Sequence, residues 1–165
     1  MTDPITTNAS VERFEFQKAL FAKGCEQVQS QIAHLDEILF KVKASAVTVW
    51  VALMGWAFTS KNVLIVPLGG VVIIGFWLLE ALFKGVQSRY IEISTRLMDL
   101  VNDRVALDRQ FQERAFESGA VYPVALKLTE FDRLSLLGRG IVSPTVATPY
   151  LFLAFSNLLV WLAVK

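Results

Sequence analysis

The chain has one cysteine and one histidine among its 165 residues, Cys25 and His34. Single residues of these types cannot form a disulfide framework or a zinc site of the usual Cys/His kind within one chain. The sequence also has no glycine-rich phosphate loop, no Ser/His/Asp set and no paired carboxylates on an apolar element. These absences argue against the common classes of enzyme, so we predict no catalytic residue, no metal and no cofactor.

Charge is missing from one long stretch of the chain. Lys61 is the only charged residue between Lys43 and Glu80, and it separates two apolar runs at residues 44–60 and 62–79. A helix of about 17 residues rises roughly 26 Å, which is close to the ~30 Å hydrocarbon core of a bilayer. The runs are therefore predicted to cross the membrane as spans at residues 44–60 and 62–83, joined by a tight turn at Lys61.

The rest of the composition also favours a membrane protein. Hydrophobic residues make up 54% of the chain and the mean hydropathy is +0.48, which is too apolar for an ordinary soluble domain of this length. The first ten residues are polar and lack a charged region followed by an apolar one, so we expect no cleaved signal peptide. We expect one membrane domain covering residues 1–165.

On both sides of the two spans, apolar residues recur at alternating steps of three and four, broken only at Lys18 and Arg104, which is the heptad pattern of helices packed along a partner. The pattern predicts helices at residues 11–43, with Ser10 as N-cap, and at residues 84–118, ending near Ser118 and Gly119. The apolar positions before the spans are Val11, Phe14, Phe21, Cys25, Val28, Ile32, Leu35, Leu39 and Val42. Those after the spans are Phe83, Val86, Tyr90, Ile93, Leu97, Leu100, Leu107 and Phe111.

Folding the chain at Lys61 lays these two helices side by side as one long antiparallel hairpin. In this register the numbers of facing residues sum to roughly 122, because both helices keep the same heptad period. Lys43 then lies near Glu80 at the membrane boundary, and Val11 lies near Phe111 at the far end. We predict an ion pair between Lys43 and Glu80.

The distribution of basic residues predicts the orientation in the membrane. The turn between the two spans carries only Lys61, whereas the flanking segments carry the other basic residues. The positive-inside rule then places both heptad helices and the N-terminus in the cytoplasm, and the turn outside.

The last 47 residues, from 119 onward, predict a connector and a third span. In the connector, residues 119–140, a short amphipathic helix is predicted at residues 129–137, with Thr129 as N-cap and its apolar side formed by Phe131, Leu134 and Leu137. Residues 141–164 carry no charge and predict a third span, which puts the C-terminus outside. Prolines at positions 144 and 149 mark its start, because the first helical turn tolerates a missing amide. The predicted fold class is an all-α membrane protein: a helical hairpin plus a third C-terminal transmembrane helix.

Polar residues inside the spans are candidate functional positions, because lipid makes them costly and they tend to face protein or water. Thr48 lies between Ala44 and Ala52 on a stripe that would let another helix approach closely. Ser156 and Asn157 lie in the middle of the third span, where an asparagine either bonds a neighbouring helix or lines a water-filled path. Candidates for lining or gating a pore are Ser156, Asn157, Thr48, Lys43 and Glu80.

The segment WLLEALFKGVQSRYIEISTRLMDLVND, residues 77–103, has an aromatic and acidic exit from the second span followed by Arg-Tyr. With the hairpin around it, residues 11–118 resemble the SLATT class of small bacterial membrane proteins, which are two-span hairpins continuous with long cytoplasmic helices. The resemblance implies an inner-membrane effector of an anti-phage system, encoded beside a nucleotidyltransferase or similar sensor. It further implies that the protein oligomerises and permeabilises the membrane when triggered by a nucleotide or oligonucleotide signal. The third span is an addition to that pattern.

Three spans are too few to enclose an ion path, so pore formation requires a homo-oligomer, for which a tetramer is the natural first guess. Arg89, Arg96 and Arg104 recur at steps of seven or eight residues on one side of their helix and are candidates for binding an anionic ligand; interhelical salt bridges are the alternative. The alternative function is a non-conducting membrane anchor that recruits a cytoplasmic partner through its coiled coils.

Overall fold

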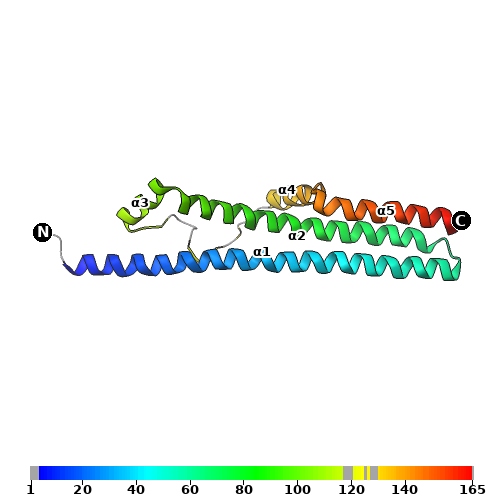
Figure 1. The fold of residues 1–165 in the computed structure, drawn as a ribbon, viewed down its shortest axis with the longest axis horizontal. Helices are drawn as coiled ribbons and strands as arrows, with labels where there is room; N and C mark the ends of the chain where they lie inside the picture. The colour runs from blue at the N-terminus through cyan, green and yellow to red at the C-terminus, as the bar shows by residue number, and fades with distance from the viewer. Residues whose placement is uncertain (1–3, 117–120, 125, 127–129, 165) are drawn as a thin grey trace. The chain divides into compact units, whose positions relative to one another are not determined.

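The structure of the protein is a computed structural model that describes residues 4–116, 121–124, 126 and 130–164. The helices, in chain order, are α1 (Pro4–Ser60), α2 (Ile65–Asn102), α3 (Arg104–Glu113), α4 (Glu130–Ile141) and α5 (Pro144–Val164) (Figure 1). No strand occurs among the described residues. The predicted all-α fold class is confirmed.

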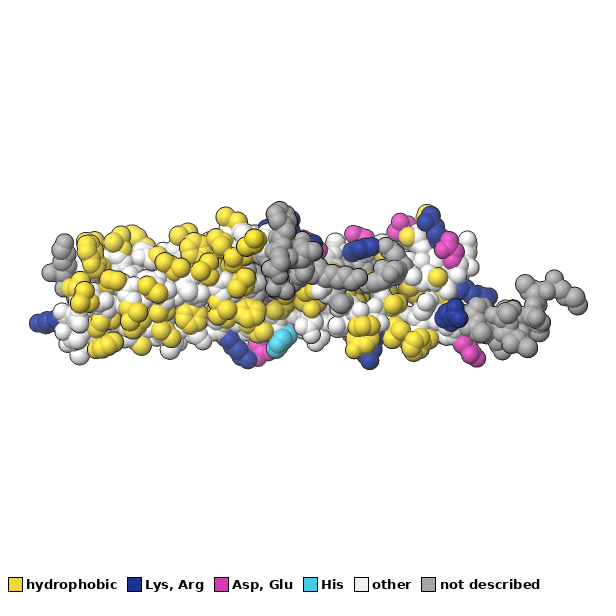
Figure 2. Space-filling view, turned by 180° about the vertical axis from the view of Figure 1, so that it is seen from behind, with side chains coloured by type: hydrophobic (Ala, Val, Ile, Leu, Met, Phe, Trp, Pro, Cys, Tyr) yellow, Lys and Arg dark blue, Asp and Glu magenta, His cyan; other side chains and the backbone are white. Residues whose placement is uncertain are grey.

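Parts of α1, α2 and α5 are long and apolar enough to cross a membrane: their candidate ranges are Val11–Ser60, Ile65–Asn102 and Pro144–Ala163. Only 22%, 33% and 17% of their most apolar windows are buried inside the chain, so most of these apolar side chains face outward. Figure 2 shows apolar side chains covering a face of the molecule around the turn between α1 and α2. Such a surface is unfavourable in water and favourable in hydrocarbon, as expected of a membrane protein.

The chain divides into two compact units where the sequence predicts one domain. Unit 1 comprises Met1–Ala33 and Ser88–Lys127, and unit 2 comprises His34–Gln87 and Leu128–Lys165. Helices α1 and α2 contribute residues to both units, and each unit has its own core.

Unit 2 holds the predicted spans. Its cores join residues of α1, α2 and α5, with Ala46, Ile73 and Tyr150 in one cluster and Met54 and Val66 in another. Within this unit α1 and α2 run antiparallel and α5 lies alongside them (Figure 1).

The predicted turn between the first two spans lies where the sequence places it. Lys61 follows the last residue of α1 and has a left-handed backbone, with φ of 50°. The Asn62 side chain then accepts a hydrogen bond from the Leu64 amide at 3.0 Å, a local bond that competes with helix formation. As a result α2 begins at Ile65 rather than at residue 62.

Helix α4 packs on α2 through two glycines. A Cβ added at Gly85 would lie 2.6 Å from the Leu136 carbonyl oxygen, and one added at Gly140 would collide with the backbone of Ala81. Leu136 is buried, whereas Leu134 is 70% exposed. The prediction that Leu134 lies on the apolar side of this helix is therefore wrong, because the glycine contacts determine which side of α4 faces α2. Thr129, the predicted N-cap, lies outside the described residues.

Unit 1 has a core of Val28, Leu97 and Val124, from α1, α2 and the segment that follows α3. This segment is held on α1 by polar contacts. The Gln27 side chain accepts a hydrogen bond from the Val124 amide at 3.0 Å and donates one to its carbonyl at 3.4 Å. The Tyr122 amide donates to the Leu20 carbonyl at 3.0 Å.

The predicted continuous helix at residues 84–118 is wrong at Asp103, where α2 ends and α3 begins. The Asp103 side chain accepts hydrogen bonds from the Val105 and Ala106 amides, so it caps α3 in place of continuing α2. Helix α3 ends at Glu113, followed by Arg114 with a left-handed backbone. The predicted end at Ser118 and Gly119 lies outside the described residues.

One further prediction about unit 1 is wrong. Helix α1 begins at Pro4, so Ser10 lies inside the helix and is not its N-cap. At the far end Phe14, one turn along α1 from Val11, packs against Phe111 with ring centroids 5.3 Å apart.

Candidate functional site

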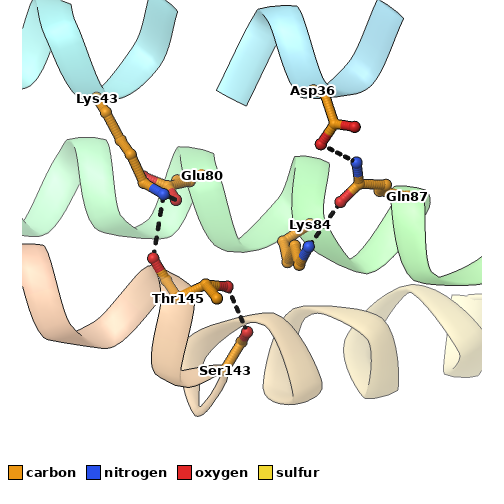
Figure 3. Close-up of polar contacts among 7 residues, drawn as sticks. All are labelled: Asp36, Lys43, Glu80, Lys84, Gln87, Ser143 and Thr145. Atoms are coloured by element: carbon orange, nitrogen blue, oxygen red, sulfur yellow. Dashed lines mark hydrogen bonds and ion pairs between the residues drawn. The ribbon is translucent and has the colours of Figure 1, made fainter. Parts of the chain in front are cut away.

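A buried ion pair joins α1 to α2 in unit 2 and confirms the predicted pair. Lys43 Nζ lies 3.1 Å from Glu80 Oε1, with the lysine side chain 36% exposed and the glutamate only 1% exposed (Figure 3). A carboxylate this deeply buried requires a partner, because an isolated charge in a low-dielectric interior is strongly unfavourable. The ion pair therefore fixes both the register and the side of contact of the two helices.

Helix α5 contributes a third group to this site. Lys43 Nζ also donates a hydrogen bond to the backbone carbonyl of Thr145 at 3.1 Å. In an α-helix that carbonyl would accept from the amide four residues later, but residue 149 is a proline inside the helix and has no amide hydrogen. The sequence thus leaves the Thr145 carbonyl without its helical donor, and the Lys43 ammonium supplies one.

Aromatic and polar groups surround the ion pair. The rings of Trp77 and Tyr150 are stacked with centroids 6.5 Å apart, and Tyr150 is 1% exposed. The Tyr150 hydroxyl is near enough to Glu80 to interact with its carboxylate. The Trp77 Nε1 is buried and has no hydrogen-bond partner among the described residues.

A second polar contact between α1 and α2 accompanies the ion pair. Gln87 is 2% exposed; its amide donates to Asp36 Oδ1 at 2.5 Å and its carbonyl accepts from Lys84 Nζ at 2.7 Å (Figure 3). These bonds satisfy an amide that would otherwise be buried without partners. The sequence carried a signal for this contact: Asp36 and Lys43 are seven residues apart, as are Glu80 and Gln87, so the two pairs repeat at heptad spacing.

Asn157 bonds α1 and α2 within unit 2 instead of facing outward. Its Oδ1 accepts from the Trp50 indole at 3.2 Å, and its Nδ2 donates to the Val66 carbonyl at 3.3 Å. A Cβ at Gly69 would lie 2.8 Å from Asn157 Oδ1, so the absence of a side chain there makes room for the amide. Of the two sequence interpretations of Asn157, the described contacts fit packing within one chain.

The remaining pore candidates are placed apart from one another. Thr48 is exposed, and its hydroxyl donates to the Ala44 carbonyl at 2.8 Å. Ala44 and Ala52, the other members of its stripe, are also exposed. Ser156 is half-buried on α5. The structure brings together Lys43 and Glu80 but does not bring Thr48 or Ser156 to them.

The candidate anion-binding arginines do not form one cluster on one helix. Arg89 pairs with Glu92, with Nη1 and Oε2 2.7 Å apart. Arg96 lies on α2 with Arg89, but Arg104 is the first residue of α3. Because the helix breaks between them, the shared side predicted for all three does not extend to Arg104.

Two side chains outside the predicted spans have shifted acid strength. Partial burial raises the pKa of the Cys25 thiol above its ordinary value. A hydrogen bond and the charge of Lys41, whose Nζ lies 2.6 Å from Glu37 Oε1, lower the pKa of the Glu37 carboxyl. Within the part of the chain that the structure describes, no group of three or more His, Cys, Asp or Glu residues could hold a metal ion.

Comparisons of the chain with known protein families, with curated proteins and with solved structures find no match. The site is therefore interpreted from its own residues. Lys43, Glu80 and Asn157 were predicted from the sequence, whereas Thr145 was not, because its carbonyl is free to accept from Lys43 only through the effect of Pro149.

Proposed function

We propose that this protein forms a homo-oligomeric, ion-conducting pore in a bacterial inner membrane. The proposed orientation has the N-terminus in the cytoplasm and the C-terminus outside, with a ring of copies around a shared axis. Four copies is the working number, since closed cyclic rings are common among homo-oligomers.

The observation that carries the proposal is the exposed face of α1 in its apolar segment. Ala44, Thr48 and Ala52 are exposed there, and Gly55 has nothing within 4 Å of the place its Cβ would occupy. Ala57, nine residues after Thr48, is completely buried; at about 100° per residue it lies on the opposite side of the helix. One stripe of the outward face of α1 therefore consists of small residues and carries a hydroxyl, which suits a narrow path between copies, while large apolar side chains such as Val51 and Trp56 are exposed beside it.

The polar group that could have lined a path on α5 is already used. Asn157 has partners on α1 and α2 of its own chain, so we assign the path to α1 and not to the third span. The SLATT resemblance supplies the proposed biological role: the toxic arm of an anti-phage system, gated by a nucleotide or oligonucleotide signal.

The test is current through the purified protein in planar bilayers, with cysteine substitutions that report the path. In a Cys25→Ser background, Thr48→Cys should lose most of its current when a charged methanethiosulfonate reagent is added. Val49→Cys is the matched control, because one residue along a helix turns the side chain by about 100° away from the path. A silent bilayer under all triggers, or equal modification of the two variants, would count against the pore.

A non-conducting anchor is the second candidate, and a groove in unit 1 favours it. A cavity of about 320 Å³ lies between α1 and α2, lined mainly by apolar groups of Cys25, Val28, Leu97, Met98 and Val101. An open apolar groove on a heptad helix pair is a place where a partner helix can bind. Absence of current together with stable capture of a cytoplasmic protein would favour this function.

A further inference from the structure

We propose that Glu80 and the Thr145 carbonyl form a binding site for a monovalent inorganic cation, in which the Lys43 ammonium acts as a tethered competitor. When the Lys43 side chain withdraws, a sodium or potassium ion takes its place. Cation binding at this site does not require that the protein conduct ions, so it is independent of the proposed pore.

The oxygen atoms of the site are those that a hard cation prefers. Glu80 provides a carboxylate that is 1% exposed and that pairs with Lys43 through Oε1. Thr145 provides a backbone carbonyl whose helical donor is removed by Pro149. Carboxylates and carbonyls released from helical bonding are the groups that hold alkali cations within membrane proteins.

Further oxygens lie next to these two. The hydroxyls of Thr145 and Ser143 are 3.0 Å apart (Figure 3), on the same turn of chain as the freed carbonyl. The hydroxyl of the buried Tyr150 also interacts with the Glu80 carboxylate. Small shifts of these side chains would complete the coordination of an ion with neutral oxygens.

Lys43 already occupies the position of a cation. Its Nζ is 3.1 Å from the Glu80 carboxylate and 3.1 Å from the Thr145 carbonyl, so one positive charge contacts both oxygens. The side chain is 36% exposed and ends a flexible four-carbon stem, so it has solvent to move into. Among the described side chains, Glu80 is the one carboxylate in this site, and a single negative charge suits a monovalent ion better than Ca²⁺ or Mg²⁺, which take more anionic ligands.

The experiment removes the tethered charge and supplies free ions. Full-length Lys43→Met in detergent micelles is unfolded thermally in mildly alkaline buffer containing sodium, potassium or choline chloride at equal ionic strength. Choline is too large for the site, so it controls for screening. Ion binding to the folded state should raise the midpoint by several degrees in sodium or potassium relative to choline. Recovery of folded protein only in sodium or potassium counts as the same result.

Two control variants make the result specific. Lys43→Arg keeps the tethered charge and should show no difference between the salts. Lys43→Met/Glu80→Gln keeps the shape of the site without its negative charge and should also show none. The absence of a sodium or potassium effect in Lys43→Met, or an equal effect in the double variant, overturns the proposal.

A measurement on the unmodified chain decides the matter if the variants do not fold. Sodium or potassium should compete with the Lys43 ammonium and increase its rate of acetylation by an amine-reactive ester, read by mass spectrometry, relative to choline. Lys41, which is exposed and not part of the site, is the internal control. Equal acetylation of Lys43 in all three salts overturns the proposal.

Discussion

Replacing Asn157 tests whether its amide holds the three spans together. Asn157→Ala removes hydrogen bonds of 3.2 Å to Trp50 and 3.3 Å to Val66. Hydrogen bonds between membrane helices average ~0.6 kcal/mol each, and the Trp50 indole left without an acceptor adds a cost of ~1–3 kcal/mol. We expect the free energy of unfolding to fall by about 2–4 kcal/mol. Ser156→Ala, at the neighbouring half-buried position, should change it by less than ~0.5 kcal/mol.

A double-mutant cycle with Trp50→Phe isolates the bond. This substitution keeps an aromatic ring and removes the indole donor, so Asn157→Ala should cost about 1 kcal/mol less in its presence. Unfolding is measured by far-UV circular dichroism during titration with a denaturing detergent. Effects that add within ~0.3 kcal/mol would refute the bond. Unchanged stability of Asn157→Ala with loss of current would instead make Asn157 a residue of the path.

Three further predictions concern packing, capping and reactivity. Gly140→Ala should lower the thermal midpoint in detergent by several degrees, because the new methyl group collides with the α2 backbone. Gly138 has open space around it, so the control Gly138→Ala should leave the midpoint equal or higher. Asp103→Ala removes the N-cap of α3 at a cost of ~1 kcal/mol, so the α3 amides should exchange hydrogen about fivefold faster. The control Asp108→Ala removes no cap and should leave the exchange rates of these amides unchanged. Because burial raises the pKa of Cys25, iodoacetamide should alkylate this thiol more slowly in the folded protein than in the unfolded chain at neutral pH. The rate in the folded protein should rise as the pH approaches the raised pKa. Equal rates at neutral pH would contradict the burial of the thiol.

The parts of the fold that follow from charge and period could be predicted from the sequence. Lys61, alone between apolar runs, marks the turn, and the antiparallel register that it sets brings Lys43 to Glu80. The break at Asp103 could not be predicted in the same way, because the apolar period of Leu97 and Leu100 before it continues at Leu107 and Phe111 after it. There a local side-chain cap competes with the helix, and heptad spacing carries no information about that competition.

Contacts distant in the sequence were harder to predict for another reason. The bond between Gln27 and Val124 joins residues 97 positions apart, and neither residue type indicates a partner by itself. Pro149 was visible as a signal for the start of a helix, but its effect on the Thr145 carbonyl matters only once Lys43 lies beside it. The ion pair of the candidate site could thus be predicted from the sequence, but the hydrogen bond from Lys43 to the Thr145 carbonyl could not.

The place of α5 in the protein follows from the same contacts. In the sequence the third span is an addition to a two-span hairpin, free to pack with its own chain or with another copy. In unit 2, however, two of its polar groups are bound by the hairpin of the same chain: the Thr145 carbonyl by Lys43, and the Asn157 amide by Trp50 and Val66. Moving α5 away from this hairpin would leave the Lys43 ammonium and the Trp50 indole of α1 without these acceptors, at a cost of several kcal/mol. The contacts of α5 therefore favour packing on the hairpin of its own chain.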